Sequence, residues 1–273
     1  MKKLWILLLA AAAVSVSAAE TKNLSYYDEG FPRTGNVEYL QEYCKLDLFL
    51  PKGKKNFPIL IWFHGGGLSA GGKHVPPNLR TDQIAVAAVN YRLSGKRAKC
   101  PDYLYDAAAA AAWVKKHIAE YGGDPERIYI AGHSAGGYLT MMLALDGRYL
   151  GAYKTDPKDF AGYFPVSGQA TTHFRILFER KAGGMNVPDV MLDEYAPIQL
   201  ARKGIPPLTL LVGDPSVEWP SRVEENLLLA ARLKRVYKND QAECLSFPSF
   251  NHGSVIAPAV AVINERILKA KKK

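Results

Sequence analysis

Apolar runs of strand length alternate with helix-length stretches along most of the chain. Residues 58–63 (PILIWF) and 84–93 (IAVAAVNYRL) are nearly continuous apolar runs, which indicates strands buried on both faces. Residues 45–51 (KLDLFLP) alternate apolar and polar side chains, as a half-buried strand does. Residues 103–123 are rich in alanine and end in two glycines, which predicts a long helix.

The same alternation continues to the end of the chain. Further strands are predicted within residues 123–132, 160–168, 206–214 and 243–249, and helices over residues 135–145, 222–237 and 254–270. Alternation of this kind predicts a mostly parallel central sheet with helices on both faces, in a single α/β domain.

Two segments do not follow this pattern. Residues 20–42 are polar, and we expect them to be irregular. Residues 146–200 have poor periodicity over most of their length. A long aperiodic segment inside an α/β domain is usually functional, so we expect part of it to form a small lid.

The amino terminus has the pattern of an export signal. Lys2 and Lys3 precede an apolar run that ends in small residues at Ala19. We therefore predict a signal peptide over residues 1–19 and a catalytic domain over 20–273, secreted or periplasmic. The apolar run is short for a bilayer span, so no stable membrane anchor is expected.

Composition narrows the classes of function. The formal net charge is +9, but part of the excess is a lysine tail at 271–273, and the other basic residues are interleaved with acids. No nucleic-acid motif accompanies this charge, so no nucleic-acid partner is expected. Cys44, Cys100 and Cys244 fit no zinc-site spacing. In an oxidising compartment they allow one disulfide and leave one thiol, with the pairing open.

A candidate nucleophile lies in the sequence GHSAG, residues 132–136. Ser134 has glycines two positions before and after it, which fits G-x-S-x-G. The preceding residues read as a strand and the following ones as a helix. A tight turn between the two would project the Ser134 hydroxyl above the sheet, as the nucleophile of an acyl-transfer enzyme requires.

Such a serine needs a base to accept its proton. His252 follows the last predicted strand and precedes the last helix, at the sheet edge that also carries Ser134. His117 lies within a helix, His133 is too close to the serine to reach back to it, and His173 lies in the expected lid. We therefore expect His252 to be the base.

The acid that orients the base is expected between Ser134 and His252 in chain order. Asp214 directly follows the strand LTLLV and its glycine, so it is the favoured candidate. Glu218, four residues later in the same segment, remains the alternative acid.

An oxyanion hole is predicted beside the serine. The run HGGG, residues 64–67, follows a buried strand, and its glycines let backbone N–H groups point at one oxygen. The expected donors are the N–H groups of Gly66, Gly67 and Ala135. No lysine-serine pair of the phosphate-binding kind follows these glycines.

Taken together, these motifs resemble the α/β-hydrolase fold of hormone-sensitive-lipase-like carboxylesterases, near secreted bacterial acetyl-xylan and feruloyl esterases. The matching stretches are FHGGG (63–67), VNYRL (89–93), YDAAAAAAWV (105–114), GGDPERIYIAGHSAGG (122–137), VGDPSVEW (212–219) and NHG (251–253). The resemblance implies a Ser134, His252 and Asp214 triad. Relatives more often place the acid a few residues after the glycine, where this chain has Ser216, and this keeps Glu218 open.

The expected activity is that of a serine carboxylic-ester hydrolase that forms an acyl-enzyme. Its partner would be an ester substrate, such as an acetylated or feruloylated plant polysaccharide, and no metal or cofactor is expected. An arylformamidase-like amidohydrolase and a non-catalytic binding module with the same fold are the alternatives.

Overall fold

The computed structural model describes residues 19–270. The predicted signal peptide, residues 1–19, therefore lies outside the described residues except for Ala19, which begins the first strand. The strands are β1 (Ala19–Ser25), β2 (Lys45–Leu50), β3 (Phe57–Phe63), β4 (Ala85–Val89), β5 (Gly123–His133), β6 (Gly162–Val166), β7 (Leu208–Val212) and β8 (Ala242–Ser246). The α-helices are α1 (Val37–Tyr43), α2 (Asp102–His117), α3 (Ala135–Leu145), α4 (Gly147–Gly151), α5 (Phe174–Ala182), α6 (Arg222–Ala231) and α7 (Ile256–Lys269).

All eight strands belong to one sheet, in the order β1-β2-β4-β3-β5-β6-β7-β8. β2 pairs antiparallel with β1 and β4, and the other neighbours are parallel. Phe63 lies opposite Gly132, and His133 lies opposite Val166. The carboxyl ends of β3, β5 and β6 therefore meet at one edge of the sheet, where this fold class binds its ligands.

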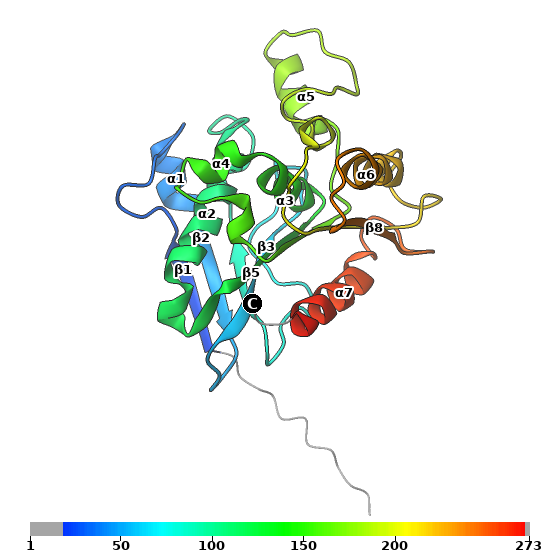
Figure 1. The fold of residues 1–273 in the computed structure, drawn as a ribbon. Coiled ribbons are helices and arrows are strands. Elements are labelled where there is room, and N and C mark those ends of the chain that lie inside the picture. Colours follow the sequence, from blue (N-terminus) through cyan, green and yellow to red (C-terminus); the bar gives the residue numbers. More distant parts are fainter. Residues whose placement is uncertain (1–18, 271–273) are drawn as a thin grey trace, which may run out of the picture.

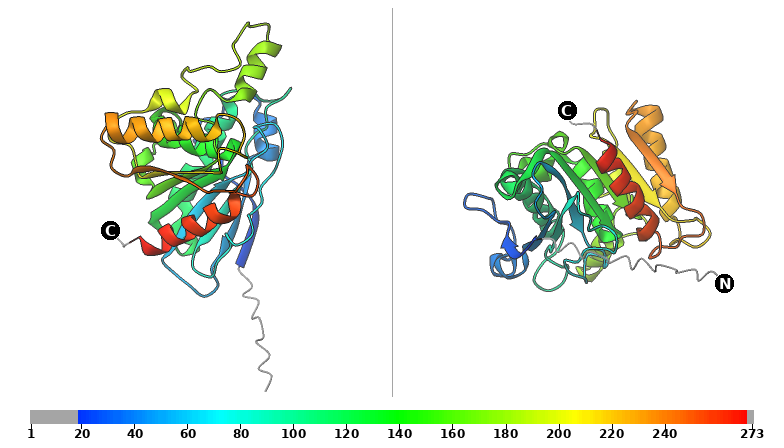
Figure 2. Two further views of the ribbon diagram at one scale, coloured as in Figure 1. Left: turned by 90° about the vertical axis from the view of Figure 1, so that its right-hand side faces the viewer. Right: turned by 90° about the horizontal axis from the view of Figure 1, so that it is seen from below.

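Helices cover both faces of the sheet, as predicted. The larger apolar cluster joins alternate side chains of the strands to α2, α3, α4 and α6, whereas the other face packs against α7. In the left view of Figure 2 the sheet runs between α6, in orange, and α7, in red. β3 is buried at every position because it lies between β4 and β5 and is covered on both faces.

The prediction that residues 20–42 are irregular is wrong. They contain most of β1 and most of α1. β1 is an edge strand with polar side chains, and α1 buries only Leu40, so neither element carries a strong apolar period. The alternating pattern of β2 predicts a half-buried strand, but Asp47 is buried as well. Its carboxylate binds Lys73 Nζ (2.6 Å) and the N–H of Asn23 (2.8 Å).

The segment expected to hold a lid divides into two parts. Residues 147–166 contain α4 and β6 and belong to the body of the domain. The part after β6 includes α5 and the chain that returns from it, and this part projects beyond the sheet (Figure 1). No helix within residues 19–270 is long and apolar enough to cross a bilayer.

Candidate active site

Ser134 lies on a sharp turn between β5 and α3. Its backbone has φ 55° and ψ −114°, outside the conformations that non-glycine residues prefer. The flanking glycines are required by close packing. A Cβ at Gly136 would lie 2.0 Å from the carbonyl oxygen of Phe63, and a Cβ at Gly132 would lie 2.6 Å from the carbonyl carbon of Gly136. The turn therefore depends on glycine at both positions.

His252 contacts the Ser134 hydroxyl directly. It lies between β8 and α7, and its Nε2 is 2.9 Å from Ser134 Oγ. Its Nδ1 lies 2.6 Å from Glu218 Oε1. Because an ionised carboxylate only accepts hydrogen bonds, Nδ1 carries the proton and Nε2 is left to accept the serine proton.

Glu218, and not Asp214, is the carboxylate beside His252. Its side chain is buried, Oε2 accepts from Ser167 Oγ (2.7 Å), and Oε1 also accepts from the N–H of Trp219 (2.9 Å). Burial raises the pKa of Glu218, but the hydrogen bond from His252 and those from Trp219 and Ser167 outweigh it and lower the pKa to about 2. The carboxylate is therefore ionised at neutral pH.

The preferred assignment of Asp214 is corrected by its contacts. Its carboxylate accepts from the N–H and hydroxyl of Ser216 (2.9 and 2.7 Å) and from the N–H of Ser249 (2.7 Å). These bonds stabilise the loop after β7. The N–H of Glu218 donates to the carbonyl of Asp214 (2.8 Å), so one helical turn carries the chain from Asp214 to the position facing His252.

The position of the Glu218 carboxylate also requires a glycine at residue 213. A Cβ at Gly213 would lie 2.9 Å from Glu218 Oε2 and 2.3 Å from the carbonyl oxygen of Phe250. Gly213 therefore leaves the space in which the acid and the loop that carries His252 approach each other.

The glycine-rich loop after β3 lies against the nucleophile. A Cβ at Gly65 would be 3.4 Å from Ser134 Cβ, and Gly66 and Gly67 have φ values of 108° and 60°. Within residues 19–270 the N–H groups of Gly66 and Gly67 have no acceptor. The N–H of Ala135 is at the first position of α3, where intrahelical partners are lacking. That these three N–H groups bind a developing oxyanion stays a prediction.

His64, which begins this loop, stabilises the loop rather than serving as a base. Its ring stacks on Tyr91 with centroids 4.4 Å apart, and the Tyr91 hydroxyl donates to the His64 carbonyl (2.8 Å). Burial lowers the pKa of His64 to about 4, so its ring is neutral at pH 7.

The chain is similar in sequence to known lipases and carboxylesterases. The BD-FAE family model matches residues 46–164, less than half of the chain. Secreted lipase 5 of Gibberella zeae is 36% identical over 155 residues, which are 46% of this chain and 28% of that protein. Carboxylesterase NlhH of Mycobacterium tuberculosis is 34% identical over 153 residues, or 52% of this chain and 48% of that protein. The chain thus spans half or less of the length of these curated relatives.

Solved structures match over nearly the full length. The propionate-bound esterase Est2 of Thermogutta terrifontis has a TM-score of 0.68 and 19% identity, covering 94% of this chain and 97% of that one. A truncated carbohydrate esterase from gut microbiota has a TM-score of 0.67 and 18% identity, covering 94% and 99%. The chain therefore has the α/β-hydrolase fold of these esterases.

Two aromatic side chains that were not predicted as site residues lie beside His252 and the glycine loop. Trp219 stacks on His252 with centroids 4.1 Å apart and stays 46% exposed. Phe174, at the start of α5, approaches Gly67 so closely that a Cβ there would lie 3.0 Å from its ring. The Phe174 and Trp219 rings meet edge to face at 6.4 Å. In the sequence Trp219 directly follows Glu218, and this adjacency could have indicated that Trp219 lies at the site.

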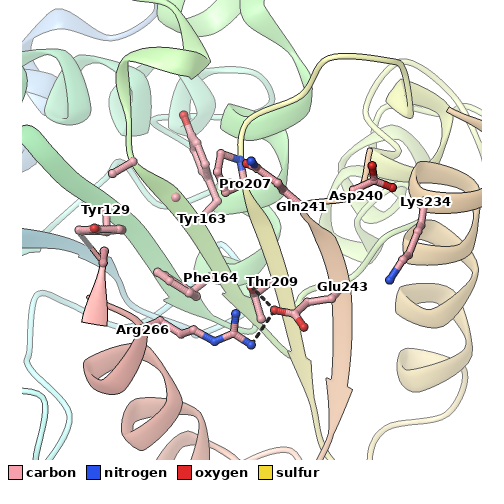
Figure 3. A pocket seen from close by; sticks show the side chains of 13 residues that line it. Tyr129, Tyr163, Phe164, Pro207, Thr209, Lys234, Asp240, Gln241, Glu243 and Arg266 are labelled. Atoms are coloured by element: carbon pink, nitrogen blue, oxygen red, sulfur yellow. Dashed lines mark hydrogen bonds and ion pairs between the residues drawn. The ribbon is translucent and has the colours of Figure 1, made fainter. Parts of the chain in front are cut away.

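A cavity of about 370 Å³ lies at the opposite edge of the sheet (Figure 3). Its lining includes Tyr129 and Phe164, together with Thr209, Glu243 and Arg266 near the amino ends of β7 and β8 and on α7. Glu243 accepts from Thr209 Oγ1 (3.1 Å) and pairs with Arg266 (2.9 Å). The cavity is therefore separate from the Ser134 site.

The described residues contain neither a disulfide nor a cluster of metal-binding side chains. Cys44, Cys100 and Cys244 are all free thiols, so the disulfide that an oxidising compartment would allow is not formed in this structure. Across residues 19–270 no three histidine, cysteine or acidic side chains gather as a metal site.

Proposed function

We propose that this hydrolase cleaves carboxylic esters through an acyl-enzyme on Ser134. The observation that carries the proposal is the hydrogen-bonded series from Ser134 Oγ through His252 to Glu218, beside free backbone donors. A serine hydroxyl is a weak nucleophile alone, and this series supplies the base and the group that orients it. The curated relatives named above as a lipase and a carboxylesterase support the same reaction class.

In the proposed reaction the Ser134 oxygen attacks the ester carbonyl while His252 Nε2 takes its proton. The negative charge that develops on the carbonyl oxygen is stabilised by the N–H groups of Gly66, Gly67 and Ala135. Glu218 stabilises the imidazolium that forms. His252 then returns the proton to the departing alkoxide, and the alcohol leaves. Water then attacks the acyl carbonyl while the same imidazole takes its proton. The proton passes to Ser134 Oγ as the acid leaves, which regenerates the serine.

The proposed substrates are acetyl or feruloyl esters of plant polysaccharide, or small esters of similar shape. Support comes from the exposed faces of Trp219 and Phe174 beside the nucleophile, because flat aromatic surfaces suit a sugar or phenolic ring. The structural likeness to a carbohydrate esterase from gut microbiota is consistent with this choice. The signal-like residues 1–19 support action outside the cytoplasm, where such polymers occur.

The test is a substrate panel with a matched serine control. The full chain, Ser134→Ala and Ser216→Ala are incubated with acetylated xylan, feruloylated arabinoxylan, p-nitrophenyl acetate and an aryl formamide, and released acid is measured. The proposal predicts release from at least one polysaccharide, lost in Ser134→Ala and kept in Ser216→Ala. Cleavage of p-nitrophenyl acetate alone would overturn the polysaccharide assignment. Cleavage of the formamide alone would favour the amidohydrolase, and no Ser134-dependent cleavage would favour a binding module.

A further inference from the structure

Ser167, which directly follows β6, has an unusual backbone and three hydrogen bonds. It is fully buried and has φ 46°, a left-handed conformation that non-glycine residues rarely adopt. Its N–H donates to the carbonyl of Leu211 (2.7 Å), its hydroxyl donates to Glu218 Oε2 (2.7 Å), and its carbonyl accepts from Arg222 Nη1. A strained residue that is restrained from several sides at an active site calls for a functional explanation.

The same short stretch also binds the nucleophile. The N–H of Ser134 donates to the carbonyl of Val166, the residue before Ser167 (2.8 Å). Val166 and Ser167 therefore contact both ends of the reacting series, the serine backbone on one side and the carboxylate of Glu218 on the other. A shift of this stretch would change the distances at both ends.

Arg222 is an unusual buried cation. It is 5% exposed, yet within residues 19–270 it forms no ion pair, and its Nε has no hydrogen-bond partner. The buried Arg92, by contrast, is paired with Asp106 through two bonds of 2.8 Å. Burying an unpaired charge is unfavourable by several kcal/mol, so a local role for the Arg222 charge is expected.

The surroundings of Arg222 indicate that role. Its guanidinium lies 5.5 Å from the centre of the Trp219 ring, which stacks on His252. Burial lowers the pKa of Arg222, and the negative charges of Glu225 and Glu218 oppose that effect. Glu225 is already bound by the N–H groups of Ala170 and Thr171. Of these two acids, Glu218 is the one that contacts His252.

We propose that Ser167 and Arg222 are positioning residues for the reaction proposed above: Ser167 occupies Glu218 Oε2 so that Oε1 faces His252, and Arg222 fixes Ser167 through its carbonyl. Neither residue touches the reacting atoms. Their effect is on the orientation of the His252 ring, so they act on the rate of the chemical step rather than on ester binding.

The chain offers a matched control on the neighbouring strand. Thr209 Oγ1 also donates to a carboxylate, that of Glu243, at the opposite edge of the sheet beside the cavity of Figure 3. Thr209→Val removes a hydroxyl-to-carboxylate bond without touching the Ser134 site. Comparing Ser167→Ala with Thr209→Val therefore separates positioning from general loss of a buried bond.

The experiment measures kcat, KM and thermal unfolding of the full chain with p-nitrophenyl acetate. Ser167→Ala and Arg222→Met should each lower kcat about tenfold or more and leave KM within about twofold, since a bond to a charged group is lost. Arg222→Lys should recover part of the loss, and Thr209→Val should keep the wild-type kcat. Wild-type kcat in Ser167→Ala and in a folded Arg222 variant would overturn the proposal, as would an equal loss in Thr209→Val.

Proton NMR tests the positioning without any turnover. The His252 Nδ1 proton, shared with Glu218, should give a far-downfield resonance in the wild type and in Thr209→Val. We expect that resonance to shift or disappear in Ser167→Ala and in Arg222→Lys to a lesser degree. An unchanged resonance would overturn the positioning role even if the chain cleaves no ester, so this failure is distinct from failure of the proposed function.

Discussion

At the residue scale, both oxygens of the Glu218 carboxylate are occupied, and this determines how His252 is oriented. Oε2 accepts from Ser167, which leaves Oε1 for His252 Nδ1 and the Trp219 N–H. An amide in place of the carboxylate could still accept a bond but would lose the charge that stabilises the imidazolium.

We therefore predict that Glu218→Gln lowers kcat for p-nitrophenyl acetate by about a thousandfold or more, as loss of the triad acid does in serine hydrolases. Asp214→Asn is the matched control, because that carboxylate binds only loop groups. It should keep kcat within about threefold. Steady-state kinetics of the two variants checks this, and the reverse order of losses would restore Asp214 as the acid.

Residue identity and spacing alone predict Ser134, His252 and the glycine loop, because each has a strong local pattern. The choice between Asp214 and Glu218 required the structure. Both acids follow β7, and only the helical turn after Asp214 shows which one faces His252. The role of Ser167 was not predictable, since it depends on contacts between segments distant in sequence.

At the element scale, the turn between β5 and α3 depends on backbone packing against β3. The Phe63 carbonyl would lie 2.0 Å from a Cβ at Gly136, and backbone cannot move aside cheaply. A Cβ at Gly151, at the end of α4, would meet nothing within 4 Å.

Gly136→Ala should therefore destabilise the protein by about 3 kcal/mol or more and abolish activity, by overpacking of the turn. Gly151→Ala should change stability by at most about 1 kcal/mol. Urea unfolding followed by circular dichroism gives both values. Equal stability of the two variants would contradict the close packing of the turn.

Strands and helices rich in apolar residues were predictable, as for β3 and α3. β1 and α1 were missed because an edge strand and a short surface helix need few apolar side chains. Only part of residues 146–200 was expected to form a lid, and α4 and β6 belong to the rest of that segment.

The projecting α5 places Phe174 beside Gly67 and Trp219. We predict that Phe174→Ala lowers kcat/KM about tenfold for a feruloyl ester but less than about threefold for ethyl acetate, which is too small to reach across to the ring. Leu228→Ala, an exposed change on α6, should alter neither. Equal losses for both esters would argue against a ring-binding role of Phe174.

At the scale of the whole molecule, three histidines make stability depend on pH: His64 and His173 are buried and His133 is part-buried. Burial lowers the pKa of His64 and His133 to about 4 and that of His173 to about 3, all below the unfolded value of about 6.5. Their neutral forms favour the folded state above about pH 6.5, and this stabilisation is lost as the pH falls through the folded pKa values.

Unfolding near pH 5 should therefore take up about three protons from these groups, and the melting temperature should fall between pH 7 and pH 5. His173→Gln should remove about one proton from this uptake, whereas the same change at the exposed His74 should remove none. Calorimetry across this pH range measures the uptake. A melting temperature independent of pH would contradict the neutral burial of these rings.

The proposed ester cleavage depends on Ser134 as the nucleophile, and one measurement tests this role most directly. It is kcat/KM for p-nitrophenyl acetate in the wild type and in Ser134→Ala, with folding checked by circular dichroism. We predict that kcat/KM falls by at least about a thousandfold in the variant, because the base then has no hydroxyl to activate. A folded Ser134→Ala variant with wild-type kcat/KM would contradict it.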